Sequence, residues 1–363
     1  MRIFYIHKDK LAKRPPVISA LLVLNDLGHK VTLIDEEIDE YWKGELTRRG
    51  ITYYEIPSHN VKGRFGKIFS YYKFRRFVYK KLQDTTKSDL IVWVEGAQTI
   101  LALGSKLNCY RHILQIQELH EHVPYQLKAI GKVIHQAEAV FMPEYNRTAL
   151  YQVWFKLQKR PIVLPNKPYF VPIEEELLAY SAKYSDIVEM FKKYKVVLYQ
   201  GHIHPERDLS AFVKASLNFP SDYKFALLGH DHGDVARYKA INPEIIHIDF
   251  IPAPEYLLVT SLCHIGVVTY SPLELNTTFC APNKIYEYAA FGKPMIAGDV
   301  PGLKVLENFG AGVMVDETKP EDILEALKDI ETNYDNYQQG TKRLWDSADN
   351  KETIRQTLAG IKL

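Results

Sequence analysis

The stretch that decides the fold runs from residue 282 to residue 302 and reads PNKIYEYAAFGKPMIAGDVPG. Pro282 suits a first helical turn because its missing N–H would be unpaired there, and Gly292 is typical of a helix end. The spacing therefore predicts a short helix between them, followed at once by an apolar strand at residues 295–297. A helix that leads directly into such a strand is typical of an α/β sheet.

Two charged side chains belong to this predicted helix. Lys284 lies in its first turn and Glu287 three residues later, so both project from one side of the helix N-terminus. Backbone N–H groups and the helix dipole favour an anion such as phosphate there, and Lys284 adds a full positive charge. The carboxylate of Glu287 would accept hydrogen bonds from the paired hydroxyls of a ribose. Together they indicate a nucleoside diphosphate site, although the same spacing also allows an ordinary surface ion pair.

Apolar runs alternate with longer helical patterns along the chain, which predicts βαβ units and parallel sheets. In the first half the predicted strands lie at residues 3–6, 31–34, 51–56, 90–94, 112–116, 139–142 and 161–164. In the second half they lie at residues 196–199, 225–228, 245–248, 265–268, 295–297 and 312–315. The proline-rich segment LPNKPYFVP, residues 164–172, joins the two halves. We therefore expect two doubly wound domains whose ligands bind at the carboxyl ends of the strands.

Further candidates lie at predicted strand ends of the second half. Gly201 follows its first strand, and Arg207 lies near the start of the next predicted helix, where a guanidinium can bind phosphate in a bidentate way. A surface pair of Arg207 with Glu206 or Asp208 is the alternative. The His-x-His sequence at residues 230–232 suggests a metal, but no third ligand accompanies it, so we expect no metal site.

The segment that begins at Pro282 resembles the donor-binding segment of family-4-type (group 1) retaining glycosyltransferases, which runs Pro-x-Lys-x-x-Glu-Tyr, then Gly-x-Pro, then Gly-x-Gly. VVLYQGHIHPERDLSAFVKA, residues 196–215, is similar to the strand, glycine turn, basic residue and helix that open the second domain of that family. QELHEHVP, residues 117–124, is similar to its acidic-x-His-Glu segment. The resemblance implies the GT-B fold, in which two Rossmann-like domains face each other across a cleft and the last helix crosses back to the first domain.

The resemblance also implies roles for individual residues. Lys284 would approach the diphosphate, Glu287 would bind the ribose, and His120 would lie near the transferred sugar and the acceptor. The candidate catalytic residues are His120, Arg207 and Lys284. The candidate donor-binding residues are Gly201, Arg207, Tyr270, Asn283, Lys284 and Glu287, and Glu118 and Glu121 are candidate sugar or acceptor contacts.

The chain departs from the family pattern in two places. The usual glutamate eight positions before the ribose glutamate is replaced by Phe279, and the nearest upstream acid is Glu274. A Gly-Gly loop, common after the first strand of relatives, is replaced by HKDKLAKRPP at residues 7–16. The sugar-contacting carboxylate therefore stays unassigned.

The expected organisation is an N-terminal acceptor-binding domain at residues 1–168, a nucleotide-sugar-binding domain at residues 169–345, and a C-terminal helix at residues 346–363 that packs on the first domain. The implied reaction moves a sugar from a UDP- or GDP-sugar to an acceptor hydroxyl with retention of configuration, and needs no further cofactor. A lipid-linked or oligosaccharide acceptor for cell-surface polysaccharide synthesis is expected. The alternatives are a sugar-nucleotide 2-epimerase of the same fold and a non-catalytic two-domain ligand-binding protein.

Charge is divided unevenly between the two halves. Residues 1–170 hold 27 Lys and Arg against 16 Asp and Glu, whereas residues 171–363 hold 19 against 28. The basic excess concentrates in VKGRFGKIFSYYKFRRFVYKKLQ, residues 61–83, where aromatics alternate with basic side chains and no acid occurs. Such a helix suits an anionic membrane, and the residues expected to face it are Arg75, Arg76, Lys80 and Lys81. Nucleic acid and a solvated helix with inward aromatics are the alternatives; we expect no nucleic-acid partner.

Composition points to an ordinary soluble globular protein, with 46% hydrophobic and 25% charged residues. Cys109, Cys263 and Cys280 lie far apart without Cys-x-x-Cys spacing, which predicts reduced thiols. The charged N-terminal residues 1–8 do not resemble a signal peptide, and no run reaches the roughly 18 apolar residues of a membrane-spanning helix. We therefore expect a cytoplasmic protein that docks on the inner face of the cell membrane through its basic helix.

Overall fold

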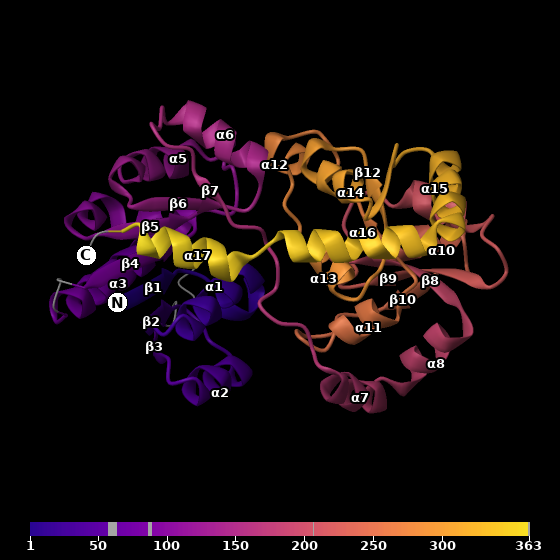
Figure 1. Cartoon of the computed structure of the whole chain (residues 1–363), viewed down its shortest axis with the longest axis horizontal. Coiled ribbons are helices and arrows are strands. Elements are labelled where there is room, and N and C mark those ends of the chain that lie inside the picture. The colour runs from indigo at the N-terminus through magenta and orange to yellow at the C-terminus, as the bar shows by residue number, and fades with distance from the viewer. Residues whose placement is uncertain (57–63, 86–88, 206, 362–363) are drawn as a thin grey trace. The chain divides into compact units, whose positions relative to one another are not determined.

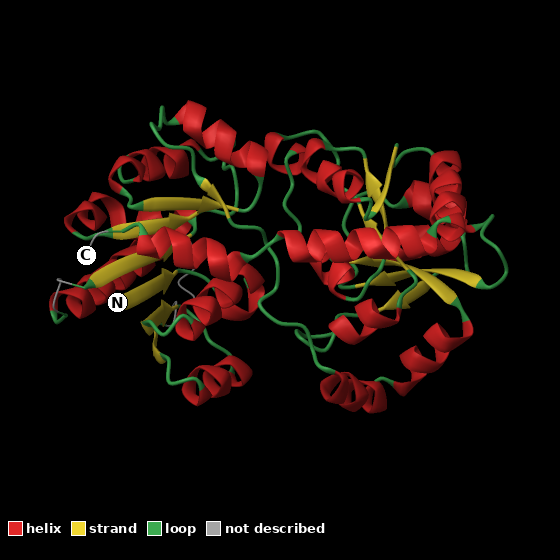
Figure 2. Cartoon of the chain, in the orientation of Figure 1, coloured by secondary structure: helices red, strands yellow, loops and turns green. Residues whose placement is uncertain are grey.

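A computed structural model describes residues 1–56, 64–85, 89–205 and 207–361 (Figure 1). The chain divides into two compact units. Unit 1 comprises Met1–Tyr169 and Asp349–Leu363, and unit 2 comprises Phe170–Ala348. Each unit is a parallel sheet flanked by helices (Figure 2), so the expected α/β architecture with two doubly wound domains is confirmed.

Unit 1 is built on a seven-stranded parallel sheet of order β3-β2-β1-β4-β5-β6-β7. The strands are β1 (Arg2–His7), β2 (Lys30–Asp35), β3 (Thr52–Glu55), β4 (Leu90–Glu95), β5 (His112–Gln115), β6 (Ala139–Met142) and β7 (Ile162–Val163). The rings of Tyr5, Trp93 and Phe141 stack in sequence on three of these strands. The Tyr5 hydroxyl and the Trp93 indole N–H both donate to the side-chain oxygen of Gln115, at 2.9 Å each, so the buried polar groups of this aromatic core are paired.

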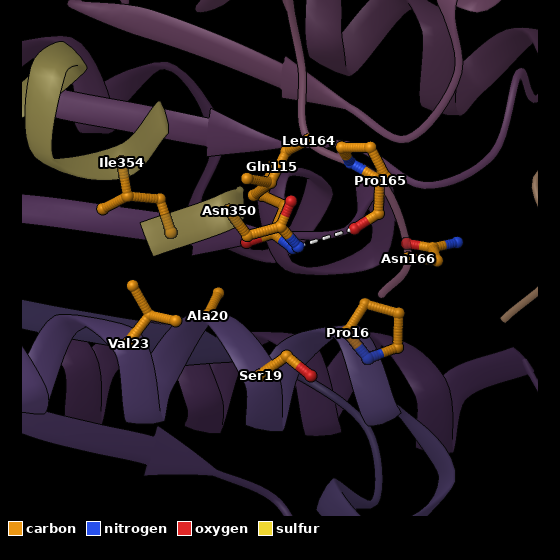
Figure 3. A pocket seen from close by; sticks show the side chains of 10 residues that line it. All are labelled: Pro16, Ser19, Ala20, Val23, Gln115, Leu164, Pro165, Asn166, Asn350 and Ile354. Carbon is orange, nitrogen blue, oxygen red and sulfur yellow. Dashed lines mark hydrogen bonds between the residues drawn. The ribbon is translucent and has the colours of Figure 1, made fainter. Parts of the chain in front are cut away.

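The last helix of the chain belongs to unit 1, as the GT-B fold implies. The helices of this unit are α1 (Pro15–Asp26), α2 (Glu40–Arg48), α3 (Arg64–Gln83), α4 (Ala97–Leu103), α5 (Pro124–Gly131), α6 (Tyr145–Trp154) and α17 (Asn350–Ala359). Helix α17 packs against α1, and the Asn350 amide donates to the carbonyl of Pro165 at 2.8 Å beside a small cavity (Figure 3). The hydroxyl of Ser19 on α1 accepts from the backbone N–H of Tyr169 at 3.0 Å. The end of the 164–169 segment and the last helix are thus both fixed to α1.

Unit 2 is built on a six-stranded parallel sheet of order β10-β9-β8-β11-β12-β13. Its strands are β8 (Lys195–Gln200), β9 (Tyr223–Leu228), β10 (Ile246–Ile248), β11 (Ile265–Val268), β12 (Met295–Gly298) and β13 (Gly312–Val315). Successive side chains of a strand point to opposite faces of the sheet, so alternate residues of β8 belong to different apolar clusters. Val196 and Leu198 belong to one cluster, and Val197 and Tyr199 belong to the other. Both faces of this sheet are therefore buried, which explains why its strands read as continuous apolar runs.

Unit 2 has ten α-helices among the described residues. They are α7 (Glu174–Lys183), α8 (Ser185–Lys193), α9 (Ser210–Ser216), α10 (Val235–Ile241), α11 (Leu257–Leu262), α12 (Leu275–Thr278), α13 (Lys284–Ala290), α14 (Lys304–Phe309), α15 (Pro320–Thr332) and α16 (Tyr334–Ser347). Helix α13 is shorter than the spacing predicts: it begins at Lys284, so Pro282 precedes it, and Phe291 caps its end. None of the described helices is both long and apolar enough to cross a membrane.

Glycine allows α13 to lie close to the sheet. A side chain at Gly266 of β11 would meet the ring of Tyr288 at 2.6 Å, and the Tyr288 hydroxyl donates to the carbonyl of Leu198 at 2.7 Å. Helix α13 is thereby held over β8 and β11. The strand order reverses between these two strands, and ligands of doubly wound sheets bind at such a reversal, outside the carboxyl ends of the strands.

Candidate functional site

A buried lysine stands at the carboxyl end of β8. Lys284, the first residue of α13, is 8% exposed, and its ammonium donates to the carbonyl of Gln200 at 2.6 Å. It also lies 4.6 Å from the centre of the Tyr199 ring. The surface ion pair that the spacing allowed is therefore wrong for Lys284.

Arg207 approaches the same strand end from the loop before α9. Its guanidinium lies 4.6 Å from the centre of the Tyr270 ring. A side chain at Gly201, where φ is +139°, would lie 3.0 Å from the Lys284 ammonium and 3.9 Å from a guanidinium nitrogen of Arg207. Only glycine leaves both cations this close to the backbone. The structure thus brings together Gly201, Arg207, Tyr270 and Lys284.

The surface alternative for Arg207 finds no support among its described neighbours. Asp208 pairs instead with Arg237, at 3.1 Å. Glu206, the other acid considered for such a pair, lies outside the described residues.

Burial and the charge of Arg207 lower the pKa of Lys284 from 10.5 to about 7. Two cations beside one stretch of backbone repel each other, and a dianion placed between them would offset that repulsion. The charge distribution at the end of β8 therefore favours a phosphate or diphosphate group.

Glu287 lies one helical turn further along α13 and is 5% exposed. One carboxylate oxygen accepts from the Gln200 amide and the other from the Tyr256 hydroxyl, both at 2.6 Å. The Thr260 hydroxyl donates to the Gln200 side-chain oxygen at 2.8 Å, which fixes the orientation of that amide. Burial raises the pKa of Glu287, although the hydrogen bond from Tyr256 and the charge of Lys284 act to lower it. Each carboxylate oxygen keeps a further lone pair with which to accept a hydrogen bond from a ligand hydroxyl.

Three supporting residues were missed by the sequence analysis. Gln200, Tyr256 and Thr260 hold the Glu287 carboxylate, yet Tyr256 and Thr260 lie in a segment that reads as an apolar helix. Gln200 offered a signal, since it is a polar residue at the end of an otherwise apolar strand.

Asn283, a candidate donor-binding residue, and Glu274, the nearest acid upstream of the expected position, both have local contacts. The carbonyl of Asn283 accepts from the N–H groups of Tyr286 and Glu287, so this residue caps α13. Glu274 stands at the N-terminus of α12 among exposed residues, where its N–H donates to the hydroxyl of Thr277.

In unit 1, His120 follows β5 in an unusual backbone conformation, with φ of +61°. Burial lowers the pKa of its half-buried imidazole, although Glu118 and Glu121 act in the opposite direction. Glu118 lies 3.4 Å from Arg147, whose guanidinium is 4% exposed and also donates to the carbonyl of Gln117. The three candidate residues of this segment are therefore held in one polar loop at the carboxyl end of β5.

A buried charged triad was not foreseen. His7, Asp35 and Glu95 end strands β1, β2 and β4 and are 2%, 0% and 3% exposed. The two imidazole nitrogens lie 2.7 Å from Asp35 and 3.3 Å from Glu95. Burial opposes protonation of His7, but the two carboxylates outweigh it, so its pKa is raised. The strand order of unit 1 reverses between β1 and β4, so the triad lies at this reversal. Lys284 lies at the corresponding reversal of unit 2, between β8 and β11.

The basic helix is α3, and its residues before Arg64, Lys62 included, lie outside the described part of the chain. Phe74, Val78 and Leu82 are buried, whereas Ile68, Phe69 and Tyr72 are 57–59% exposed. Three of the four basic residues expected to face a membrane, Arg75, Arg76 and Lys80, are exposed. Lys81 is half-buried, with its ammonium 3.9 Å from the centre of the Tyr54 ring.

Residues 194–333, most of unit 2, match the family model described as "Glycosyl transferases group 1". The match confirms the resemblance to group 1 glycosyltransferases that the motifs at residues 196–215 and from Pro282 onward indicated. No curated protein matches the chain.

Among solved structures, HepE of Anabaena in complex with UDP and glucose is similar at 12% identity and a TM-score of 0.73, over 99% of this chain and 100% of HepE. Sucrose-phosphate synthase of Thermosynechococcus elongatus is similar at 15% identity and 0.68, over 99% and 97%. The lipopolysaccharide outer core galactosyltransferase WaaB, solved without ligand, is similar at 14% identity and 0.63, over 99% of both chains. These likenesses cover both units and show that the fold is GT-B.

The lowered pKa of Lys284 predicts a pH-dependent cost of burial. In the unfolded chain a lysine has a pKa of about 10.4, so between about pH 7 and 10 the unfolded chain binds more protons and stability rises with pH. Lys284→Met removes this contribution of Lys284 to the pH dependence of stability. Its stability relative to the wild type should therefore fall by about 2–3 kcal/mol between pH 6 and pH 9, measured by urea denaturation. Lys239→Met, at an exposed position of α10, is the control and should show no such trend. Equal pH dependence in the two variants would mean that Lys284 keeps an ordinary pKa.

Proposed function

We propose that this protein is a retaining glycosyltransferase that moves a sugar from a UDP-sugar to the hydroxyl of a glycan acceptor. The proposal rests on two cations that lie beside Gly201, namely Lys284 and Arg207. The Glu287 carboxylate lies one helical turn away from Lys284 on α13. Cations suit the diphosphate, and a carboxylate suits the ribose hydroxyls. The complexes of HepE with UDP and with UDP-glucose support uracil as the base.

In this proposal the cations at β8 stabilise the leaving group. The bond between the anomeric carbon and the phosphate oxygen breaks, and its electron pair stays on UDP as positive charge develops on the sugar ring. The negative charge of the bound diphosphate favours the charged form of Lys284 before the reaction begins, so its ammonium stabilises the phosphate as further negative charge develops, and Arg207 binds the same group. The acceptor oxygen then bonds to the anomeric carbon, and its proton passes to the departing phosphate oxygen.

We assign the acceptor to unit 1. His120, Glu118 and Glu121 form a polar loop at the carboxyl end of β5, where they would orient the sugar and the acceptor hydroxyl. The exposed apolar and basic side chains of α3 would place this unit on an anionic membrane that carries a lipid-linked acceptor. WaaB, a galactosyltransferase of the lipopolysaccharide outer core, has the same fold, which supports an acceptor of this class.

The nucleotide site is tested by comparing UDP with uridine. Glu287→Gln should weaken both ligands, whereas Arg207→Ala and Lys284→Ala should weaken UDP alone. Losing one charge-assisted contact should cost about tenfold to a hundredfold in affinity, measured by calorimetry. Arg237→Ala is the control, since this partly exposed arginine pairs with Asp208 and Asp234. Wild-type affinity for UDP in all three site variants would place the nucleotide elsewhere.

The role of His120 is tested by a substitution that can adopt the positive φ of this position. Asparagine adopts positive φ more readily than most side chains, so His120→Asn removes the imidazole with little strain at φ of +61°. UDP release from UDP-sugars should slow about tenfold or more, while the dissociation constant for UDP stays unchanged. An unaltered turnover number would exclude His120 from the reaction.

Membrane docking is tested by flotation with liposomes of defined charge at low salt. Reversing Arg75, Arg76 and Lys80 to Glu should release the protein from anionic vesicles, because each basic residue near the surface contributes about 1 kcal/mol. The matched control reverses Lys128, Lys132 and Lys159, three exposed lysines of unit 1, and should still float. If wild-type protein ignores anionic vesicles, or if both triple variants behave alike, α3 is not the docking surface.

A further inference from the structure

A pair of histidines lies at the carboxyl ends of β8 and β9. Nε2 of His232 is 3.4 Å from Nδ1 of His202, and the two rings are 5.6 Å apart between their centres. Both side chains are exposed. The loops that carry them are joined by backbone hydrogen bonds, from the Ile203 N–H to the His230 carbonyl at 3.1 Å and from the His232 N–H to the Ile203 carbonyl at 3.0 Å. The backbone therefore fixes the two histidines beside each other.

This pairing differs from the one that the His-x-His sequence suggests. The ring of His230 stacks on Phe250, at 4.6 Å between centres, and one of its nitrogens lies 3.6 Å from the carboxylate of Asp249. His230 is thus engaged with another loop. The rings beside His232 are those of His202 and His204, at 5.6 and 5.5 Å between centres, and of these two it is His202 that places a ring nitrogen 3.4 Å from Nε2 of His232. From the sequence no metal was expected here, because no third ligand accompanies the histidines of residues 230–232.

The spacing of the two nitrogens fits a shared metal ion. At a metal–nitrogen distance of 2.0–2.1 Å, two ligands of a tetrahedral ion lie about 3.3–3.4 Å apart. The observed 3.4 Å agrees with this span and is long for a direct hydrogen bond. We propose that His202 and His232 bind a late first-row divalent ion such as Zn²⁺ or Ni²⁺, for which imidazole is a suitable ligand.

Charged groups of both signs surround the histidine pair. Arg207 and Lys284 repel a cation, whereas the neighbouring Asp231 is an anion whose Oδ1 accepts from the N–H groups of residues 233–235. The remaining coordination positions are open to water, which makes this a site of moderate affinity. The site does not depend on the proposed glycosyl transfer.

The test is titration of the full-length protein with ZnCl₂, followed by calorimetry in a non-coordinating buffer at pH 7.5. Wild-type protein should bind one equivalent at this site, and the metal should raise the melting temperature because it binds only the folded state. His202→Ala and His232→Ala should each weaken that binding at least tenfold. His230→Ala is the matched control and should bind as the wild type does.

Two results would overturn the proposal. One is equal zinc affinity in the wild type and in the His202→Ala/His232→Ala double variant, which would assign the binding to other histidines. The other is loss of binding in His230→Ala alone, which would place the ion at the His-x-His sequence. Circular dichroism of each metal-free variant establishes that it is folded, so that a lost site is distinguished from a lost fold.

Discussion

The site at the carboxyl end of β8, the first strand of unit 2, is organised around one buried lysine. The ammonium of Lys284 donates to the carbonyl of Gln200, and this contact fixes the start of α13 above β8. Burial of a cation is costly unless it is paired, and here the charge of Arg207, another cation, lowers the pKa of Lys284 more than the carboxylate of Glu287 raises it. Such an arrangement contributes little to folding, which is the usual sign of a site retained for its ligand.

Glycines at the ends of the strands allow side chains and neighbouring backbone to come close enough to form this site. Gly266 allows Tyr288 to lie flat on β11, and Gly201 leaves room for both cations. A side chain at Gly229 would lie 2.0 Å from the carbonyl of Gly201, so the ends of β8 and β9 meet at two glycines. The cradle is therefore shaped by backbone, with charged side chains reaching it from helices and loops.

The sequence predicted the fold well because strands buried on both faces are continuous apolar runs, and each of the thirteen has a counterpart in the two sheets. Lys284, Glu287, Gly201 and Arg207 were also singled out, since each follows a recognisable strand or lies in a recognisable segment. The structure places Gly201, Arg207 and Lys284 together at the end of β8, with Glu287 one helical turn along α13. Polar partners from separate elements were not found. His7 contacts Asp35 and Glu95, and His202 contacts His232. These residues come from strands, or loops after strands, that are neighbours in a sheet, and the local sequence does not reveal which strands are neighbours.

The two strand reversals differ in their charged groups, and this difference is compatible with the assignment of ligands that we propose. Unit 2 is acidic overall, yet its reversal holds Lys284 and Arg207. Unit 1 is basic overall, yet its reversal holds the carboxylates of Asp35 and Glu95 around His7, and Glu118 lies beside Arg147 after β5. Carboxylates repel a diphosphate and accept hydrogen bonds from hydroxyls. A neutral, hydroxyl-rich acceptor is therefore compatible with unit 1, and the net charge of each unit describes its outer surface rather than its site.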